Sequence, residues 1–171
     1  QYYPKAGWVE HDAEEIYNNV LMAVKELMRD ADMTANYSMA ITNQRETVVV
    51  WDITTGKPVY NAVVWQCMRG VDICNKLKAE GYGPMVMEKS GLLIDPYFAA
   101  SGAKWILDNV DGAREKAKHG ELLMGTMESW LIWKLTEGKC HVSDYTNASR
   151  TMLMNIHTLQ WDDDLLKLFT I

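Results

Sequence analysis

The stretch that decides the fold covers residues 37–52, which read Tyr37-Ser38-Met39-Ala40-Ile41-Thr42-Asn43-Gln44-Arg45-Glu46-Thr47-Val48-Val49-Val50-Trp51-Asp52. Its two flanks, residues 37–42 and 47–52, carry the β-branched and aromatic residues that are typical of short strands. Between the flanks stand Arg45 and Glu46, a cation and an anion that would be costly to bury without partners. We therefore predict two strands with a charged pair at the point where one ends and the next begins.

Two interpretations of Arg45 and Glu46 follow from the residue types. The pair could be a surface ion pair on an edge strand, contributing less than ~1 kcal/mol. At a cleft, the same pair offers a fork of donors beside two acceptor oxygens, which suits a polyhydroxylated ligand. Because ligands bind at strand ends and loops of α/β sheets, the residues as a set favour a polar-ligand site, and they indicate no reaction.

The rest of the chain alternates helical and strand-like segments. Asp12 is the expected N-cap of a helix whose apolar face carries Ile16, Val20 and Val24 and which ends near Asp32. A short strand is expected at residues 62–65. Further helices are expected at residues 68–80, 101–109, 112–118, 126–135 and 161–169, with a loop at 94–98 and a strand at 141–143. Strands early and helices later indicate the α/β class.

Composition excludes several classes of protein. The 171 residues fit one domain, and a net charge of −6 argues against a nucleic-acid partner. No apolar run reaches the ~18 residues that a membrane span needs. Cys67, Cys74 and Cys140 are an odd set, which favours reduced thiols in the cytoplasm. The four histidines are scattered, so no metal site is predicted.

Two aromatic residues have both a structural and a functional interpretation. Trp65 ends a strand, where its ring could face a cleft, although the residues alone favour a core position. Tyr97 follows Asp95-Pro96 in a loop and could simply pack there. The chain has no Walker loop, no glycine fingerprint for a dinucleotide and no Gly-x-Ser-x-Gly elbow. A phosphate site or a hydrolase nucleophile is therefore not predicted within it.

Six blocks of sequence, in order, resemble the FGGY carbohydrate kinases, and among them the glycerol kinases. The resemblance covers essentially the whole chain, and its Asn-Gln-Arg-Glu and Asp-Pro-Tyr-Phe blocks are specific to the members that phosphorylate glycerol. The blocks are residues 7–12, 41–47, 64–67, 94–98, 104–108 and 144–151.

The resemblance implies an actin-like, ribonuclease H-like α/β fold of two domains around a cleft. Residues 1–171 would be a part of the N-terminal, glycerol-binding domain, truncated at both ends, with the C-terminal domain absent. The full-length enzyme would be a cytoplasmic homo-oligomer that uses ATP and Mg²⁺ to convert glycerol to glycerol 3-phosphate. The family's phosphate-contacting hairpin would precede Gln1, and its catalytic aspartate would follow Ile171. No catalytic or nucleotide-binding residue is therefore expected here, and the isolated chain is expected to be inactive.

The same resemblance implies roles for four residues. Arg45, Glu46 and Tyr97 match residues that hydrogen-bond the glycerol hydroxyls, and Trp65 matches the aromatic residue that lies against the glycerol carbons. This replaces the core interpretation of Trp65. Asp144 falls in a structural block, so we do not expect it to act as the base.

Two departures from the family pattern affect helix packing or subunit contacts. Gly102 stands where a lysine is usual, and Met68 replaces one arginine of a Trp-Gln-x-Arg-Arg run. Two alternatives stay open: another FGGY kinase acting on a pentulose or hexulose, and a non-catalytic binding or assembly domain.

Overall fold

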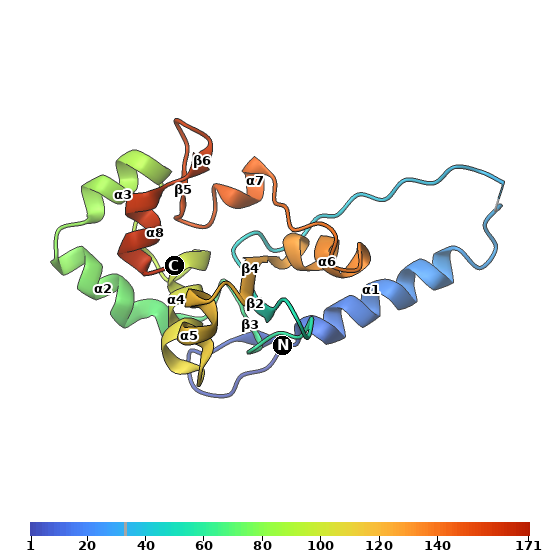
Figure 1. Cartoon of the computed structure of the whole chain (residues 1–171), viewed down its shortest axis with the longest axis horizontal. Helices are drawn as coiled ribbons and strands as arrows, with labels where there is room; N and C mark the ends of the chain where they lie inside the picture. Colours follow the sequence, from blue (N-terminus) through green and yellow to red (C-terminus); the bar gives the residue numbers. More distant parts are fainter. Residues whose placement is uncertain (33) are drawn as a thin grey trace.

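The computed structural model describes residues 1–32 and 34–171. It contains a four-stranded sheet and a separate two-stranded hairpin, with helices packed around them (Figure 1). The elements in chain order are β1 (Glu10–His11), α1 (Ala13–Leu27), β2 (Val48–Asp52), β3 (Ala62–Val63), the 3₁₀ turn η1 (Met68–Gly70), α2 (Val71–Ala79), α3 (Gly83–Ser90), α4 (Ala99–Asn109), α5 (Ala113–Lys118), β4 (Leu122–Thr126), α6 (Met127–Leu135), α7 (Tyr145–Ala148), β5 (Met154–Asn155), β6 (Gln160–Trp161) and α8 (Asp163–Phe169).

The four-stranded sheet has the strand order β1-β3-β2-β4, and all of its pairings are antiparallel. The longest pairing joins β2 to β4, from Val48 opposite Thr126 to Asp52 opposite Leu122. All five residues of β2 are buried, which agrees with its nearly continuous apolar run. β2 is therefore the centre of the sheet and of the molecule.

The side chains of β2 divide between the two faces of the sheet. Val48 and Val50 pack in a core with α4 and α5 on one face. Val49 and Trp51 pack in a second core with α6 and the start of α1 on the other. Successive strand residues point to opposite faces, so one short strand joins two cores and the sheet is the middle of three layers.

A third core lies away from the sheet, among α2, α3 and α8. It includes Val86 of α3, Ile94, Leu153 and Phe169, all almost completely buried. In Figure 1 these helices lie at the end of the molecule opposite to the tip of α1. This core fixes Ile94, which immediately precedes the Asp95-Pro96-Tyr97 loop.

The predicted helices are confirmed, with small shifts of their ends. Asp12 caps α1, because its Oδ1 accepts hydrogen bonds from the backbone N–H groups of Glu14 (2.9 Å) and Glu15 (3.1 Å). α1 ends at Leu27 rather than near Asp32. The helix predicted from Met68 begins as the η1 turn and continues as α2.

Two predicted strands are wrong. Residues 37–42 are irregular and mostly exposed, and within the described chain no strand lies beside them, so their strand-like composition has no pairing partner (Figure 1). Residues 141–143 are also irregular, because His141 reaches β4 through its side chain instead of its backbone. Its Nε2–H donates to the carbonyl oxygen of Met124 at 2.9 Å.

Six elements were not predicted: β1, α3, β4, α7, β5 and β6. β4 reads Leu-Leu-Met-Gly-Thr, which has one β-branched residue and a glycine, so it lacks the usual strand signal. Gly125 is required there, because a Cβ at this position would lie 2.5 Å from the Cβ of Ser129 on α6. α3 begins at Gly83-Pro84, which favours a turn, although proline also suits a first helical turn.

The structure explains one of the two departures from the family pattern. Gly102 lies in α4 where that helix meets the sheet, and a Cβ there would lie 3.0 Å from Val48 Cγ1 and 3.1 Å from Val63 Cγ1. A side chain at this position would press on both valines, which favours glycine here. Met68 is 53% exposed, and nothing in the structure explains its replacement of an arginine.

Candidate functional site

The Asn-Gln-Arg-Glu block lies against the block of residues 144–150. Asn43 Nδ2 donates to Asn147 Oδ1 at 3.0 Å, and Arg45 Nη1 donates to the Thr146 carbonyl oxygen at 3.3 Å. Asn43 Oδ1 also accepts from the backbone N–H of Glu128 at 3.3 Å. These bonds join segments about a hundred residues apart, so two of the six sequence blocks form one surface.

Asp144 shapes the partner block. It caps α7 and accepts hydrogen bonds from the Asn147 backbone N–H (2.8 Å), the Thr146 hydroxyl (2.8 Å) and the Asn147 side chain (3.0 Å). The Asn147 backbone N–H, then its side-chain amide and the Thr146 hydroxyl, lower the pKa of Asp144 below its ordinary 3.8. A carboxylate held in this way orders a loop, which agrees with the structural role expected from the sequence.

Glu46 and Arg45 separate although they are neighbours in the chain. Arg45 is exposed, whereas Glu46 is only 7% exposed. Glu46 Oε1 accepts from Arg150 Nε at 2.8 Å, forming an ion pair. Arg45 and Glu46 therefore do not form a surface pair with each other, and the buried carboxylate takes its partner from the other block.

Arg150 also connects Glu46 to aromatic side chains. Its guanidinium carbon lies 4.9 Å from the ring centroid of Phe98 and 6.0 Å from that of Tyr97. The rings of Tyr97 and Trp65 are tilted against each other with centroids 5.3 Å apart. A continuous series of contacts thus joins Glu46, Arg150, Tyr97 and Trp65.

The local folding of residues 94–98 explains where Tyr97 lies. Ile94 is buried in the third core, and Asp95 Oδ1 accepts from the Tyr97 backbone N–H at 3.0 Å, which closes a tight turn. Trp65 follows β3 and borders the first core while staying half-buried. It is therefore neither a full core residue nor a free surface residue.

Three of the four predicted site residues belong to this series of contacts, and Arg45 does not. Arg45 lies beside the same block, bonded to Thr146. The carboxylate and the aromatic rings lie on either side of Arg150. A carboxylate can accept a hydrogen bond from a hydroxyl, and a ring face can cover C–H groups, which suits a polyol.

The residue that sequence reasoning missed is Arg150. It stands inside the block of residues 144–151, but its spacing from Glu46 carries no local signal. Only the family block itself pointed to this segment.

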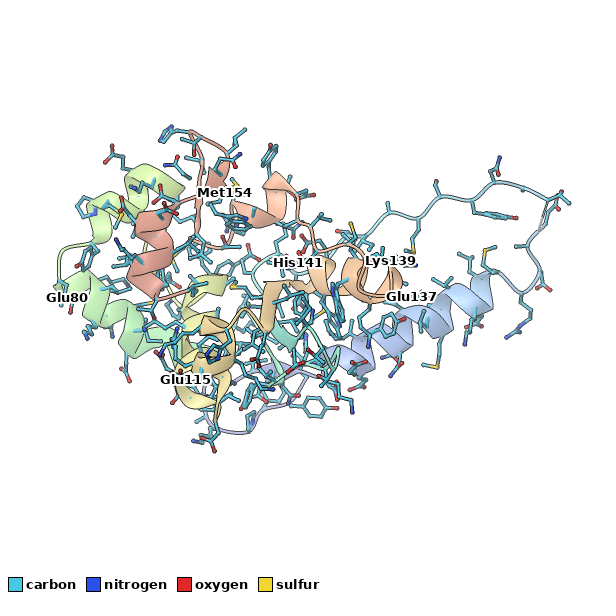
Figure 2. The ribbon with its side chains drawn as sticks, in the orientation of Figure 1. Glu80, Glu115, Glu137, Lys139, His141 and Met154 are labelled. Carbon is cyan, nitrogen blue, oxygen red and sulfur yellow. The ribbon has the colours of Figure 1, made fainter. Side chains whose placement is uncertain are left out.

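A cavity of about 500 Å³ lies elsewhere, beside β4 and the β5–β6 hairpin. Among the described residues that line it are Gly125, His141 and Trp161, and none of the four predicted site residues is among them. Figure 2 shows His141 beside β4, where its ring bonds the strand edge. The cavity is mostly apolar and is separate from the Glu46 contacts.

The described part of the chain holds neither a metal cluster nor a membrane-spanning helix. Within residues 1–32 and 34–171, no three or more His, Cys, Asp or Glu side chains gather as metal ligands would. Cys67, Cys74 and Cys140 are free thiols. None of the described helices combines the length and apolar character that crossing a membrane requires.

Comparison with known proteins places the chain in a family. The model of the N-terminal domain of the FGGY family of carbohydrate kinases matches residues 1–171. The glycerol kinase of Bacillus thuringiensis (strain Al Hakam) is 57% identical over 173 aligned residues, which cover 100% of this chain and 35% of that protein. The glycerol kinase of Bacillus cytotoxicus is also 57% identical, with the same coverage.

Solved structures agree with the sequence match. The glycerol kinase of Plasmodium falciparum, solved with ADP, superposes with a TM-score of 0.90 at 38% identity, over 99% of this chain and 34% of that chain. The gluconate kinase of Lactobacillus acidophilus superposes with a TM-score of 0.84 at 20% identity, over 99% of this chain and 33% of that chain, which shows a shared fold.

The chain spans about a third of the length of the relatives that it matches. The predicted actin-like, ribonuclease H-like α/β class is confirmed by these matches. With a family model matching every residue and relatives at 57% identity, this chain belongs to the FGGY family of carbohydrate kinases, as an N-terminal domain of that family.

Proposed function

We propose that the chain is the glycerol-binding part of a longer glycerol kinase, which transfers the γ-phosphoryl group of ATP to a terminal hydroxyl of glycerol in the cytoplasm. The observation that carries the proposal is the contact series from Glu46 through Arg150 and Tyr97 to Trp65. It links a carboxylate through Arg150 to aromatic faces, at the sequence blocks that resemble glycerol kinases. The 57% identity to the Bacillus enzymes supports the same choice of substrate.

In this proposal each residue contributes to holding the polyol. Glu46 accepts a hydrogen bond from a hydroxyl, Tyr97 donates or accepts one through its phenol, and Trp65 covers the C–H side of the molecule. Arg45 donates to a second hydroxyl from its exposed position next to Thr146. Positioning of the reactive hydroxyl is the part of the catalysis that these residues supply.

Magnesium and the nucleotide are substrates of the proposed whole enzyme, and we assign them to no residue of this chain. Within the described residues, no cluster of acidic side chains fits a divalent cation, and the sequence has no glycine-rich phosphate loop. The proposed contribution of this chain is therefore to bind and orient the polyol.

Steady-state kinetics of the full-length enzyme test the proposal. Glycerol should support ADP formation from ATP, whereas a pentulose, a hexulose and gluconate should support far less. A preference for one of those sugars would instead assign the chain to another FGGY kinase. No turnover with any polyol or sugar would favour a binding or assembly domain.

Arg45→Ala tests the site within that assay. Losing a charge-assisted hydrogen bond costs about 1.5–3 kcal/mol, so the glycerol KM should rise at least about tenfold while the ATP KM stays nearly constant. Arg29→Ala removes the same charge from an exposed turn after α1 and is the matched control. An unchanged glycerol KM in Arg45→Ala would contradict the role of Arg45.

A further inference from the structure

Arg150 contacts both a carboxylate and two aromatic rings. Its Nε donates to Glu46 Oε1 at 2.8 Å, while its guanidinium carbon lies near the ring centroids of Phe98, at 4.9 Å, and Tyr97, at 6.0 Å. Its side chain keeps 28% exposure, so it stands at the edge of the site rather than in a core. One side chain thus joins the segment that precedes β2 to the loop at residues 94–98.

We propose that Arg150 is a positioning residue for polyol binding, which holds the carboxylate of Glu46 at a fixed place relative to the Tyr97–Trp65 aromatic pair. The inference rests on the proposed function and extends it to a residue that acts on the substrate only through others.

The geometry uses properties that distinguish arginine from lysine. A guanidinium is planar, and its edge can bond a carboxylate while its face packs on an aromatic ring. A lysine ammonium is a point charge and can replace the charge without replacing this arrangement. Arg150 should therefore not be replaceable by lysine.

The group that Arg150 positions is the carboxylate of Glu46. It is 7% exposed, so its charge needs a partner, and Arg150 supplies one through Oε1. Among the hydrogen bonds between described residues, Oε1 accepts from Arg150 and Oε2 accepts none. Oε2 is therefore left as an acceptor whose direction is set by Arg150.

The aromatic side of the site depends on the same contact. Tyr97 packs on Phe98 with ring centroids 5.1 Å apart and on Trp65 at 5.3 Å. The guanidinium of Arg150 lies over the first of these pairs. Replacing Arg150 takes away a side chain that contacts both the carboxylate and the rings.

A double-mutant cycle in the full-length enzyme tests this inference. The variants are Arg150→Gln, Arg150→Lys, Glu46→Gln and the double variant Glu46→Gln/Arg150→Gln, each measured for glycerol KM, ATP KM and kcat. Arg150→Gln and Arg150→Lys should both raise the glycerol KM at least about tenfold, in the range for losing a charge-assisted hydrogen bond. The ATP KM should change less than about twofold, because the proposed role of Arg150 concerns the polyol alone.

The cycle separates positioning from packing. If Arg150 acts through Glu46, the effect of Arg150→Gln on glycerol KM should fall below about threefold in the Glu46→Gln background. Equal effects in both backgrounds, or an unchanged glycerol KM, would overturn the inference. Rescue of glycerol KM by Arg150→Lys would overturn it too, because charge alone would then suffice.

Two controls keep the result interpretable. Arg29→Gln removes an equal charge at an exposed position and should leave all three constants unchanged. Arg150→Lys keeps the charge that Glu46 needs, so it remains folded if Arg150→Gln does not. Failure of the wild-type enzyme to phosphorylate glycerol would overturn the proposed function. If the wild type is active but the effects of Arg150→Gln and Glu46→Gln on the glycerol KM simply multiply in the double variant, only the role of Arg150 is overturned.

Discussion

Arg45 and Glu46 show how two adjacent residues take opposite roles. The charged pair looks like one unit in the sequence, yet Arg45 stays exposed and bonds a carbonyl while Glu46 turns inward to Arg150. Both residues lie in the turn that precedes β2, so neighbours in sequence need not be neighbours in space.

The residue types of the candidate site could be proposed from the sequence, and their partners could not. Glu46, Tyr97 and Trp65 were proposed because their sequence blocks resemble the family, and their role in binding stays a prediction. Arg150 was missed because its pairing with Glu46 depends on how segments 104 positions apart meet. Residue chemistry can be inferred from a sequence, but tertiary pairing cannot be inferred from spacing.

Asp162 makes a prediction about acid stability. Burial alone would raise its pKa, but the Lys89 ammonium, the Asn155 amide and the Leu165 backbone N–H outweigh burial and hold the pKa at about 2, below the ordinary 3.8. Because the folded pKa is lowered, its stabilisation is complete above about pH 4 and is lost as the pH falls towards 2. Asp162→Asn keeps the cap of α8 but loses the ion pair, so it should lower the free energy of unfolding at pH 7 by about 1–2 kcal/mol.

Urea denaturation at a series of pH values from neutral to strongly acid checks this prediction. The difference in the free energy of unfolding between wild type and Asp162→Asn should shrink as the pH falls from about 4 towards 2. Asp164→Asn is the control, because Asp164 contacts the same Lys89 but its side chain is 66% exposed. Its effect should stay below about 1 kcal/mol. A wild-type and Asp162→Asn difference that is the same at every pH would contradict the assigned pKa.

At the scale of elements, the spacing of apolar residues predicted the position of a helix well where that helix has one apolar face. α1, α4, α6 and α8 were located within a few residues because apolar spacing, and in α1 and α8 an acidic N-cap, are local signals. β2 was predicted from its β-branched run. β4 was missed because its pairing with β2, and not its own composition, makes it a strand. Residues 37–42 show the converse, a strand-like composition that no described neighbour pairs with.

The junction between η1 and α4 makes a prediction about packing. A Cβ on Gly70 would lie 2.5 Å from Ser101 Oγ and 2.8 Å from Ser101 Cβ. Gly70→Ala should therefore lower the free energy of unfolding by about 1–3 kcal/mol, the usual cost of overpacking. Chemical denaturation measures the change.

Two further variants make that result specific. Gly83→Ala adds the same methyl group where nothing beyond the neighbouring residues lies within 4 Å. It should cost less than Gly70→Ala, because only the strain of a helical alanine before Pro84 opposes it. Gly70→Ala combined with Ser101→Gly should recover part of the loss, because the clashing atoms are removed. Equal effects for Gly70→Ala and Gly83→Ala would show that the junction is not closely packed.

At the scale of the whole molecule, the three cores contain almost all of the buried apolar side chains, and most of α1 and residues 34–45 lie outside them. Figure 1 shows α1 and the returning chain extending away from the sheet. Most side chains of residues 34–45 are exposed, whereas every residue of β2 is buried. The fold is therefore densely packed around β2 and open along one arm.

This contrast predicts a pattern of hydrogen exchange. The backbone N–H groups of residues 36–42 donate no hydrogen bond to a described residue. They should therefore have exchanged their hydrogen for deuterium at the first time point measured. The N–H groups of β2 lie in the central ladder and should be the slowest to exchange. Mass spectrometry of peptides covering the two segments distinguishes them. Strong protection of residues 36–42 would show that this segment pairs in solution, as its composition suggested.

The bonds between Asn43 and Asn147, Arg45 and Thr146, and Glu46 and Arg150 have a consequence for how the protein is made. A ribosome releases the first block long before the second, so a nascent chain carries Glu46 for about a hundred residues of synthesis without Arg150. Closing so long a loop must precede any substrate recognition. Affinity for the polyol should thus arise late and abruptly during translation, once the segment around Arg150 has left the exit tunnel.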